Sequence, residues 1–173
     1  MKPETASERW TLRSERRTGD LARLLAAHAA LAEEMGWDAT FEAYVAQPMA
    51  ATVLTAARRE RIWMVESDGR FQGSVAIVQA GADPQVAQLR WFLVAPDARG
   101  QGLGKVLLER ALAFAREVGY GRVLLWTVQQ LEAAAHLYQA LGFVKTQEVP
   151  GTHWGADVIE EQYTLWLERR GGA

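Results

Sequence analysis

The sequence predicts an α/β (α+β) fold in which a mixed, mostly antiparallel central sheet of about seven strands is flanked by about four helices. Two observations support this prediction. First, strand-like and helix-like segments neither alternate regularly nor separate into blocks, because they follow the order β-α-α-β-β-β-α-β-α-β-β. Second, 49% of the 173 residues are apolar, which is enough to form a core. We therefore expect a single domain over residues 1–173, with residues 1–8 frayed.

The first part of the chain indicates a short strand followed by two helices. The segment RWTLRSER at 9–16 alternates weakly and predicts the strand. Apolar residues then recur at helical spacing over 21–35, and Gly36 ends that helix. A second helix starts near 38–40, and Pro48 within it predicts a kink or a break.

Strand patterns dominate the rest of the chain. Asp68-Gly69 lies between two short apolar runs and is a strong hairpin signal. A later run, GRVLLWTV, is apolar throughout, as strands buried on both faces are. The further expected strands cover 61–67, 70–79, 85–95, 121–128, 143–149 and 161–168, and the further expected helices cover about 102–118 and 131–142.

Composition and charge exclude several classes of protein. The net charge is −2 with basic residues spread along the chain, which disfavours a nucleic-acid surface. The absence of cysteine excludes disulfides and a cysteine nucleophile, and three histidines without paired spacing predict no metal site. The polar N-terminus lacks the apolar core of a signal peptide, and no apolar run reaches the roughly 18 residues of a membrane span. We therefore expect a cytoplasmic protein with no membrane or nucleic-acid partner.

A glycine-rich turn between a strand and a helix is the most informative motif. It contains Arg99-Gly100-Gln101-Gly102-Leu103-Gly104-Lys105. A Walker loop would need glycine at position 99 and Ser or Thr at 106, where this chain has arginine and valine. A dinucleotide fingerprint starting at Gly100 would need glycine at 105, where this chain has lysine.

This turn nevertheless suits an anion such as a pyrophosphate. Glycines let the main chain turn sharply and approach a ligand closely, so that successive amides form a concave set of donors. The positive end of the following helix and the charges of Arg99 and Lys105 add to the attraction. The alternative is a plain tight turn, for which a single glycine would suffice.

The motif Val-x-Pro-x-x-Arg-Gly-x-Gly-x-Gly, which begins at Val94, resembles the acetyl-coenzyme A pyrophosphate motif of GNAT-type N-acetyltransferases. LYQALGF at 137–143 resembles that superfamily's Tyr-x-x-x-Gly-Phe signature. A closer resemblance, to the acetyltransferase halves fused to MarR-type regulators, involves AEEMGWDATFEA, LRWFLVAPDARGQGLGK and LLWTVQQLEAAAHLYQALGF. We expect a stand-alone relative, to which no DNA-binding role transfers.

The resemblance implies acetyl-CoA as co-substrate and assigns residues to it. The strand before the motif would offer its main chain at Leu93 and Val94 to the pantetheine arm. Many members carry Asn seven residues before the tyrosine, where this chain has Leu131, so another contact must replace it, and Thr127 or Gln129 could serve. The expected coenzyme-binding residues are Leu93, Val94, Arg99, Gly100, Gln101, Gly102, Leu103, Gly104, Lys105 and Thr127.

Tyr138 is the predicted general acid. The resemblance aligns it with the tyrosine that protonates the departing coenzyme thiolate. Its position on an apolar helical stripe with Leu131, Ala134, Ala135 and Leu141 leaves a second interpretation open, in which it is a core residue. Even a core tyrosine needs a partner for its hydroxyl.

The base and the acceptor contacts are predicted from position. Glu33 and Glu34 end the first helix beside Trp37, at a loop that borders the acceptor pocket in the family. A carboxylate there could bind a cationic amine or take its proton, so Glu34 is the candidate base, and Glu33 and Trp37 are candidate substrate contacts. An ordinary charged helix end is the alternative. His153 and Trp154 lie in an expected loop between the last strands and are candidate substrate contacts. His28 lies on the apolar stripe of its helix, where a satisfied core histidine is the more common case.

The predicted function is an acetyl-CoA-dependent N-acetyltransferase that moves the acetyl group directly to a primary amine of a small molecule or a protein. Without cysteine, an acyl-cysteine intermediate is excluded. A catalytically silent acyl-CoA-binding sensor or interaction domain is the alternative, and Leu131 keeps it open. A homodimer is compatible with the apolar last strands.

Overall fold

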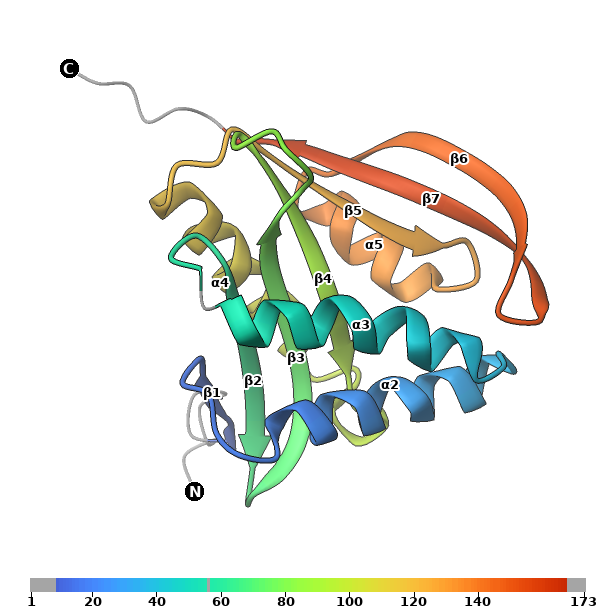
Figure 1. Cartoon of the computed structure of the whole chain (residues 1–173), viewed down its shortest axis with the longest axis horizontal. Coiled ribbons are helices and arrows are strands. Elements are labelled where there is room, and N and C mark those ends of the chain that lie inside the picture. The colour runs from blue at the N-terminus through green and yellow to red at the C-terminus, as the bar shows by residue number, and fades with distance from the viewer. Residues whose placement is uncertain (1–8, 56, 168–173) are drawn as a thin grey trace.

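The computed structural model describes residues 9–55 and 57–167 (Figure 1). The predicted order of elements is confirmed, with one short 3-10 helix added before the glycine turn. The elements are β1 (Thr11–Arg13), α2 (Asp20–Met35), α3 (Thr40–Thr55), β2 (Arg61–Ser67), β3 (Arg70–Gln79), β4 (Val86–Val94), η1 (Pro96–Ala98), α4 (Leu103–Glu117), β5 (Arg122–Val128), α5 (Glu132–Ala140), β6 (Val144–His153) and β7 (Ala156–Trp166).

The seven strands form one mixed sheet in the order β1-β2-β3-β4-β5-β7-β6. Every neighbouring pair is antiparallel except β4 and β5, which run parallel. The fold class predicted from the sequence, including the mostly antiparallel pairing, is therefore confirmed.

The two faces of the sheet carry separate cores, because alternate residues of a strand point to opposite faces. On one face, Leu24, Val45 and Met49 of α2 and α3 pack against strand residues such as Met64 and Ala76. On the other face, α4 and α5 pack against the strand residues of opposite parity. Figure 1 shows α2 and α3 lying across β2–β4 and leaving the β6–β7 hairpin projecting beyond them.

Two local predictions differ from the structure. The break expected at Pro48 is absent, because α3 is one helix of 16 residues that continues across it, whereas the kink stays a prediction. The expected loop between the last strands is a tight hairpin, since β6 extends to His153 and β7 begins at Ala156. Trp154 and Gly155 form its turn with φ of 54° and 75°, which is the backbone that a right-handed twisted hairpin favours.

Two sequence predictions concern residues outside the part of the chain that the structure describes. They are the frayed start at 1–8 and the last position of the strand expected over 161–168. Within 9–55 and 57–167, no helix combines the length and the apolar character that crossing a bilayer requires.

Candidate active site

The candidate site lies where the parallel strands β4 and β5 separate. Their register covers only Val86↔Arg122, Ala87↔Val123 and Gln88↔Leu124. Both strands continue beyond this point, β4 to Val94 and β5 to Val128. Main-chain groups that would have paired across the sheet therefore face an opening between the two strands.

A bulge in β4 accompanies this separation. Ser74 of β3 pairs with Leu93 whereas Ala76 pairs with Arg90, so β4 has one residue more than β3 over this stretch. Trp91 within the bulge has a positive φ of 48°, an uncommon backbone for a bulky residue. The Ser74 hydroxyl donates to the Trp91 carbonyl at 2.7 Å and holds this conformation. No periodicity in the sequence marks the bulge.

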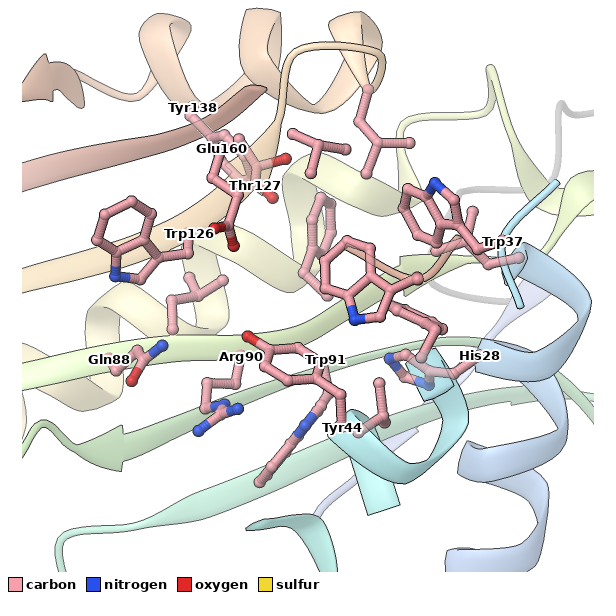
Figure 2. A pocket seen from close by; sticks show the side chains of 18 residues that line it. His28, Trp37, Tyr44, Gln88, Arg90, Trp91, Trp126, Thr127, Tyr138 and Glu160 are labelled. Atoms are coloured by element: carbon pink, nitrogen blue, oxygen red, sulfur yellow. The ribbon is translucent and has the colours of Figure 1, made fainter. Parts of the chain in front are cut away.

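A pocket opens at this point, between the sheet, α2, α3, α5 and the tip of the β6–β7 hairpin (Figure 2). Its walls combine aromatic side chains with a few polar ones. They are His28, Leu31, Trp37, Phe41, Tyr44, Val45, Gln88, Leu89, Arg90, Trp91, Phe92, Trp126, Thr127, Val128, Leu131, Tyr138, Trp154 and Glu160.

Tyr138 of α5 lines the pocket, with only 5% of the residue exposed. Its ring packs 5.9 Å from each of the rings of Phe92, Phe143 and Tyr163. Its hydroxyl makes no hydrogen bond to any residue that the structure describes, unlike the satisfied hydroxyl expected of a core tyrosine. Burial raises the pKa of Tyr138, so the hydroxyl keeps its proton near neutral pH.

The glycine turn ends at the N-terminus of α4. Gly100 and Gly102 have φ of 72° and 84°, and open space lies where a side chain would be. The first amides of a helix have no acceptor within the helix. The turn therefore offers amides at an open surface, which fits a phosphate group.

Gly104 has a different role from the other two glycines of the turn. A Cβ atom there would come within 2.9 Å of Leu137 and 3.3 Å of the Phe92 ring. This glycine lets α4 approach α5 and β4 closely. Phe92, which touches both Gly104 and Tyr138, connects the turn to the pocket.

The side chains of the turn are already engaged with the protein. Both terminal nitrogens of Arg99 donate to the two oxygens of Glu34 at 2.6 and 2.8 Å, and its Nε donates to the Val94 carbonyl. Gln101 donates to the Asp97 carbonyl at 2.7 Å and accepts from Arg9. Lys105 is exposed, 3.7 Å from Glu109.

The ion pair between Arg99 and Glu34 concerns the predicted base, which is Glu34. Arg99 lowers the pKa of Glu34, and Glu34 does not line the pocket. Glu33 does not line it either. Neither carboxylate of α2 therefore has a role in the proposed mechanism.

The predicted acceptor residues fall into two groups. Trp37 and Trp154 line the pocket with Phe41 and Tyr44. Within this group, the centroids of neighbouring rings lie 4.8 to 5.3 Å apart. The hairpin tip is fixed there because the Asp38 amide donates to the Trp154 carbonyl at 2.8 Å. His153 does not line the pocket but lies 3.2 Å from Glu160, which does.

Two pocket residues were not assigned a role by the sequence. Glu160 lay between the loop expected over 150–157 and the strand expected from 161, and only the β5–β7 register, Val128↔Glu160, brings it to the pocket. His28 lines the wall while its Nδ1 lies 2.7 Å from the Leu24 carbonyl, and burial lowers its pKa. Among the residues that the structure describes, no group of three His, Asp or Glu side chains could hold a metal ion.

This geometry places the remaining predicted residues. Thr127 and Leu131 line the pocket, whereas Leu93 and Val94 continue β4 beside it. Leu103 is buried in the core as the first residue of α4. The site thus combines a strand-to-helix turn that is open at Gly100 and Gly102 with a pocket where two parallel strands separate.

The chain belongs to the acetyltransferase (GNAT) family, whose model matches residues 24–143. It is 39% identical over 87 residues to N-acetyltransferase family 8 member 2 of Rattus norvegicus, across 49% of this chain and 38% of the relative. It is 37% identical over 82 residues to the uncharacterised N-acetyltransferase YjgM of Escherichia coli K12, across 47% and 49%. The matches thus span half or less of these relatives.

Solved structures share the fold over almost the whole chain. The yncA protein of Salmonella typhimurium, solved with its cofactor acetyl-CoA, superimposes with a TM-score of 0.70 at 20% identity, covering 94% of this chain and 96% of that one. An N-acetyltransferase of Staphylococcus aureus Mu50 gives a TM-score of 0.75 at 20% identity, covering 92% and 99%. At this identity the likeness concerns the fold alone.

Proposed function

We propose that this protein is an acetyl-CoA-dependent N-acetyltransferase that transfers the acetyl group directly to a primary amine. The observation that carries the proposal is the buried Tyr138, whose hydroxyl has no described protein partner, in a pocket that opens between β4 and β5. The family membership and the open amides at the start of α4 support acetyl-CoA as the co-substrate.

In the proposed site, each element has its own role in binding acetyl-CoA. The amides at the start of α4 bind the pyrophosphate, and the main chain of β4 beyond the bulge binds the pantetheine arm. Lys105 adds positive charge at the turn, while the ion pair with Glu34 fixes Arg99 beside it. Thr127 and Leu131 face the pocket from the opposite side, and there the apolar Leu131 contributes packing only.

The chemistry follows from the placement of Tyr138. A neutral amine attacks the thioester carbonyl, the carbon–sulfur bond breaks, and the sulfur leaves as a thiolate. A thiol with an ordinary pKa of about 8.5 leaves more readily when it receives a proton. The Tyr138 hydroxyl, kept protonated by burial, is the proposed donor.

Thiol release from acetyl-CoA tests the proposal directly. We expect the protein to bind coenzyme A in calorimetry and to release free thiol only when a suitable primary amine from a broad panel is present. Coenzyme binding without thiol release across the panel would instead support the silent acyl-CoA-binding alternative. An absence of heat with coenzyme A would contradict both.

We also propose, from the sequence, that the protein is cytoplasmic and forms a homodimer. Its closer resemblance to the acetyltransferase halves fused to MarR-type regulators is likewise a proposal.

A further inference from the structure

We propose that Glu160 binds the ammonium group of the acceptor and takes its proton, and that the acceptor is a primary amine with an apolar body. This inference rests on the proposed N-acetyltransferase function and deepens it by naming a catalytic residue and a class of acceptor.

Glu160 lies at the mouth of the pocket from a fixed position on the sheet. It is on β7, directly opposite Val128 of β5, and its side chain is 24% exposed. Thr127, Val128 and Tyr138 line the same pocket. An amine held by this carboxylate would therefore lie in the pocket that Tyr138 also lines.

Among the residues that the structure describes, Glu160 is the only carboxylate that lines this pocket. The neighbouring Glu161 points to the opposite face of the sheet, where it accepts from Lys145 at 2.5 Å and from the Tyr163 hydroxyl at 3.1 Å. Among the described residues, Glu160 has one side chain at ion-pair distance, the imidazole of His153 at 3.2 Å. Its carboxylate thus retains acceptor capacity toward the pocket.

The other titratable and charged groups of the pocket complement this assignment. They are His28 of α2, Tyr44 of α3, Arg90 of β4 and Tyr138 of α5. The Arg90 guanidinium lies 5.3 Å from the Trp91 ring, and Figure 2 shows it pointing away from the Glu160 carboxylate. His28 is buried with its Nδ1 against Leu24, and burial favours its neutral form. Attraction for a cation in the pocket therefore centres on Glu160.

The pocket walls indicate what the amine carries. Trp37, Phe41, Tyr44 and Trp154 form a contiguous aromatic wall. Tyr44 is 47% exposed, so this wall extends to solvent. Aromatic surface favours an apolar body through burial and favours a nearby cation through the ring faces. An apolar primary amine satisfies both features.

The proton balance is complete with groups that the chain provides. The ammonium gives one proton to the Glu160 carboxylate, which frees the nitrogen lone pair to form the new nitrogen–carbon bond. Tyr138 protonates the departing sulfur, and the second proton lost by the nitrogen restores the Tyr138 hydroxyl. Glu160 passes its proton to the adjacent imidazole of His153, whose side chain is 45% exposed to solvent.

A matched pair of probes tests the inference without relying on turnover. We would measure the binding of 2-phenylethylamine and 2-phenylethanol by calorimetry, with coenzyme A present, to the wild type and to Glu160→Gln. We expect the wild type to bind the amine about 10-fold or more tightly than the alcohol. Glu160→Gln should abolish that preference while leaving the affinity for the alcohol within about twofold.

Two control variants and one activity measurement make the outcome decisive. Glu148→Gln removes an exposed carboxylate of the same hairpin and should retain the preference. Glu160→Asp should retain part of it. Thiol release with 2-phenylethylamine should fall about 100-fold in Glu160→Gln, with unchanged affinity for acetyl-CoA.

An unchanged preference in Glu160→Gln, or equal affinity of the wild type for the two probes, would overturn the inference. If the wild type releases thiol with amines but Glu160→Gln behaves like it, the inference fails and the proposed function stands. If no amine supports thiol release, the proposed function fails instead, and the assignment of Glu160 as proton acceptor falls with it.

Discussion

At the scale of single residues, Tyr138 has features of both interpretations that the sequence left open. Its apolar neighbours on α5 made a core role reasonable, and the structure does bury its ring among Phe92, Phe143 and Tyr163. A core tyrosine is expected to find a hydroxyl partner, whereas the hydroxyl of Tyr138, a residue that lines the pocket, has none among the described residues. The position therefore combines a packed ring with an available proton.

Replacement of Tyr138 by phenylalanine tests the proton donor. Phe keeps the ring and its packing, so we expect the free energy of unfolding and the coenzyme affinity to change little. Turnover should fall about 100-fold or more, as when a general acid is lost. Steady-state thiol release and calorimetry measure the two quantities, and equal turnover in the variant would remove the acid assignment.

Glu160 shows the opposite case, a residue that its local sequence could not assign. The sequence pattern started the last strand at 161 and left Glu160 outside it. Its place at the pocket depends on the pairing of β7 with β5, and strand register is set by contacts between segments far apart in the chain.

At the scale of elements, the turn between β4 and α4 contains glycines of two kinds. Gly100 and Gly102 are required by a left-handed backbone and border open space, whereas Gly104 is required by close packing against Leu137 and Phe92. The sequence motif indicated an anion site but treated the three as equivalent. Only the packing of α4 against α5 distinguishes them.

Gly102→Val tests the anion site against a matched control at the other end of the same helix. Gly119 has the same φ of 84° and equally open surroundings. Each substitution should lower the free energy of unfolding by about 1–2 kcal/mol, since a side chain is strained at this backbone. Only Gly102→Val should weaken coenzyme A binding, by about 10-fold or more.

Denaturant unfolding and calorimetry with coenzyme A distinguish these effects. If both variants bound the coenzyme as the wild type does, the turn would not hold the pyrophosphate. If both lost affinity equally, strain in α4 rather than contact at Gly102 would be the cause.

At the scale of the whole molecule, a buried ion cluster fastens one edge of the sheet to the helix layer. Arg13 of β1 donates to both oxygens of Asp20 on α2, at 2.8 and 2.7 Å, and to both oxygens of Glu66 on β2, at 3.1 and 2.9 Å. All three side chains are largely shielded from solvent. Removing one partner of such a cluster leaves charges without compensation.

Arg13→Ala should therefore lower the free energy of unfolding by about 3 kcal/mol at neutral pH. The exposed pair Arg122–Asp83, 3.8 Å apart, provides the control, and Arg122→Ala should change it by less than about 0.5 kcal/mol. Equal losses in the two variants would show that the cluster is not a special source of stability.

The same cluster predicts a dependence on pH. Hydrogen bonds from Arg13 hold the pKa values of Asp20 and Glu66 below their ordinary range. Groups with a lowered pKa stabilise the fold above their unfolded pKa, about 4, and lose that contribution as the pH falls below it. The difference between wild type and Arg13→Ala should thus shrink below about pH 4 in denaturant titrations.

The sequence by itself determined the order of the elements, the class of the sheet, the glycine turn and the position of Tyr138. These features follow from local periodicity and from backbone needs of single residues, which neighbouring residues encode. Tertiary structure decided the bulge at Trp91, the separation of β4 from β5 and the pairing of Arg99 with Glu34, 65 residues away. It also decided that Glu160 reaches the pocket. Each of these depends on register and packing between distant segments, which no local pattern contains.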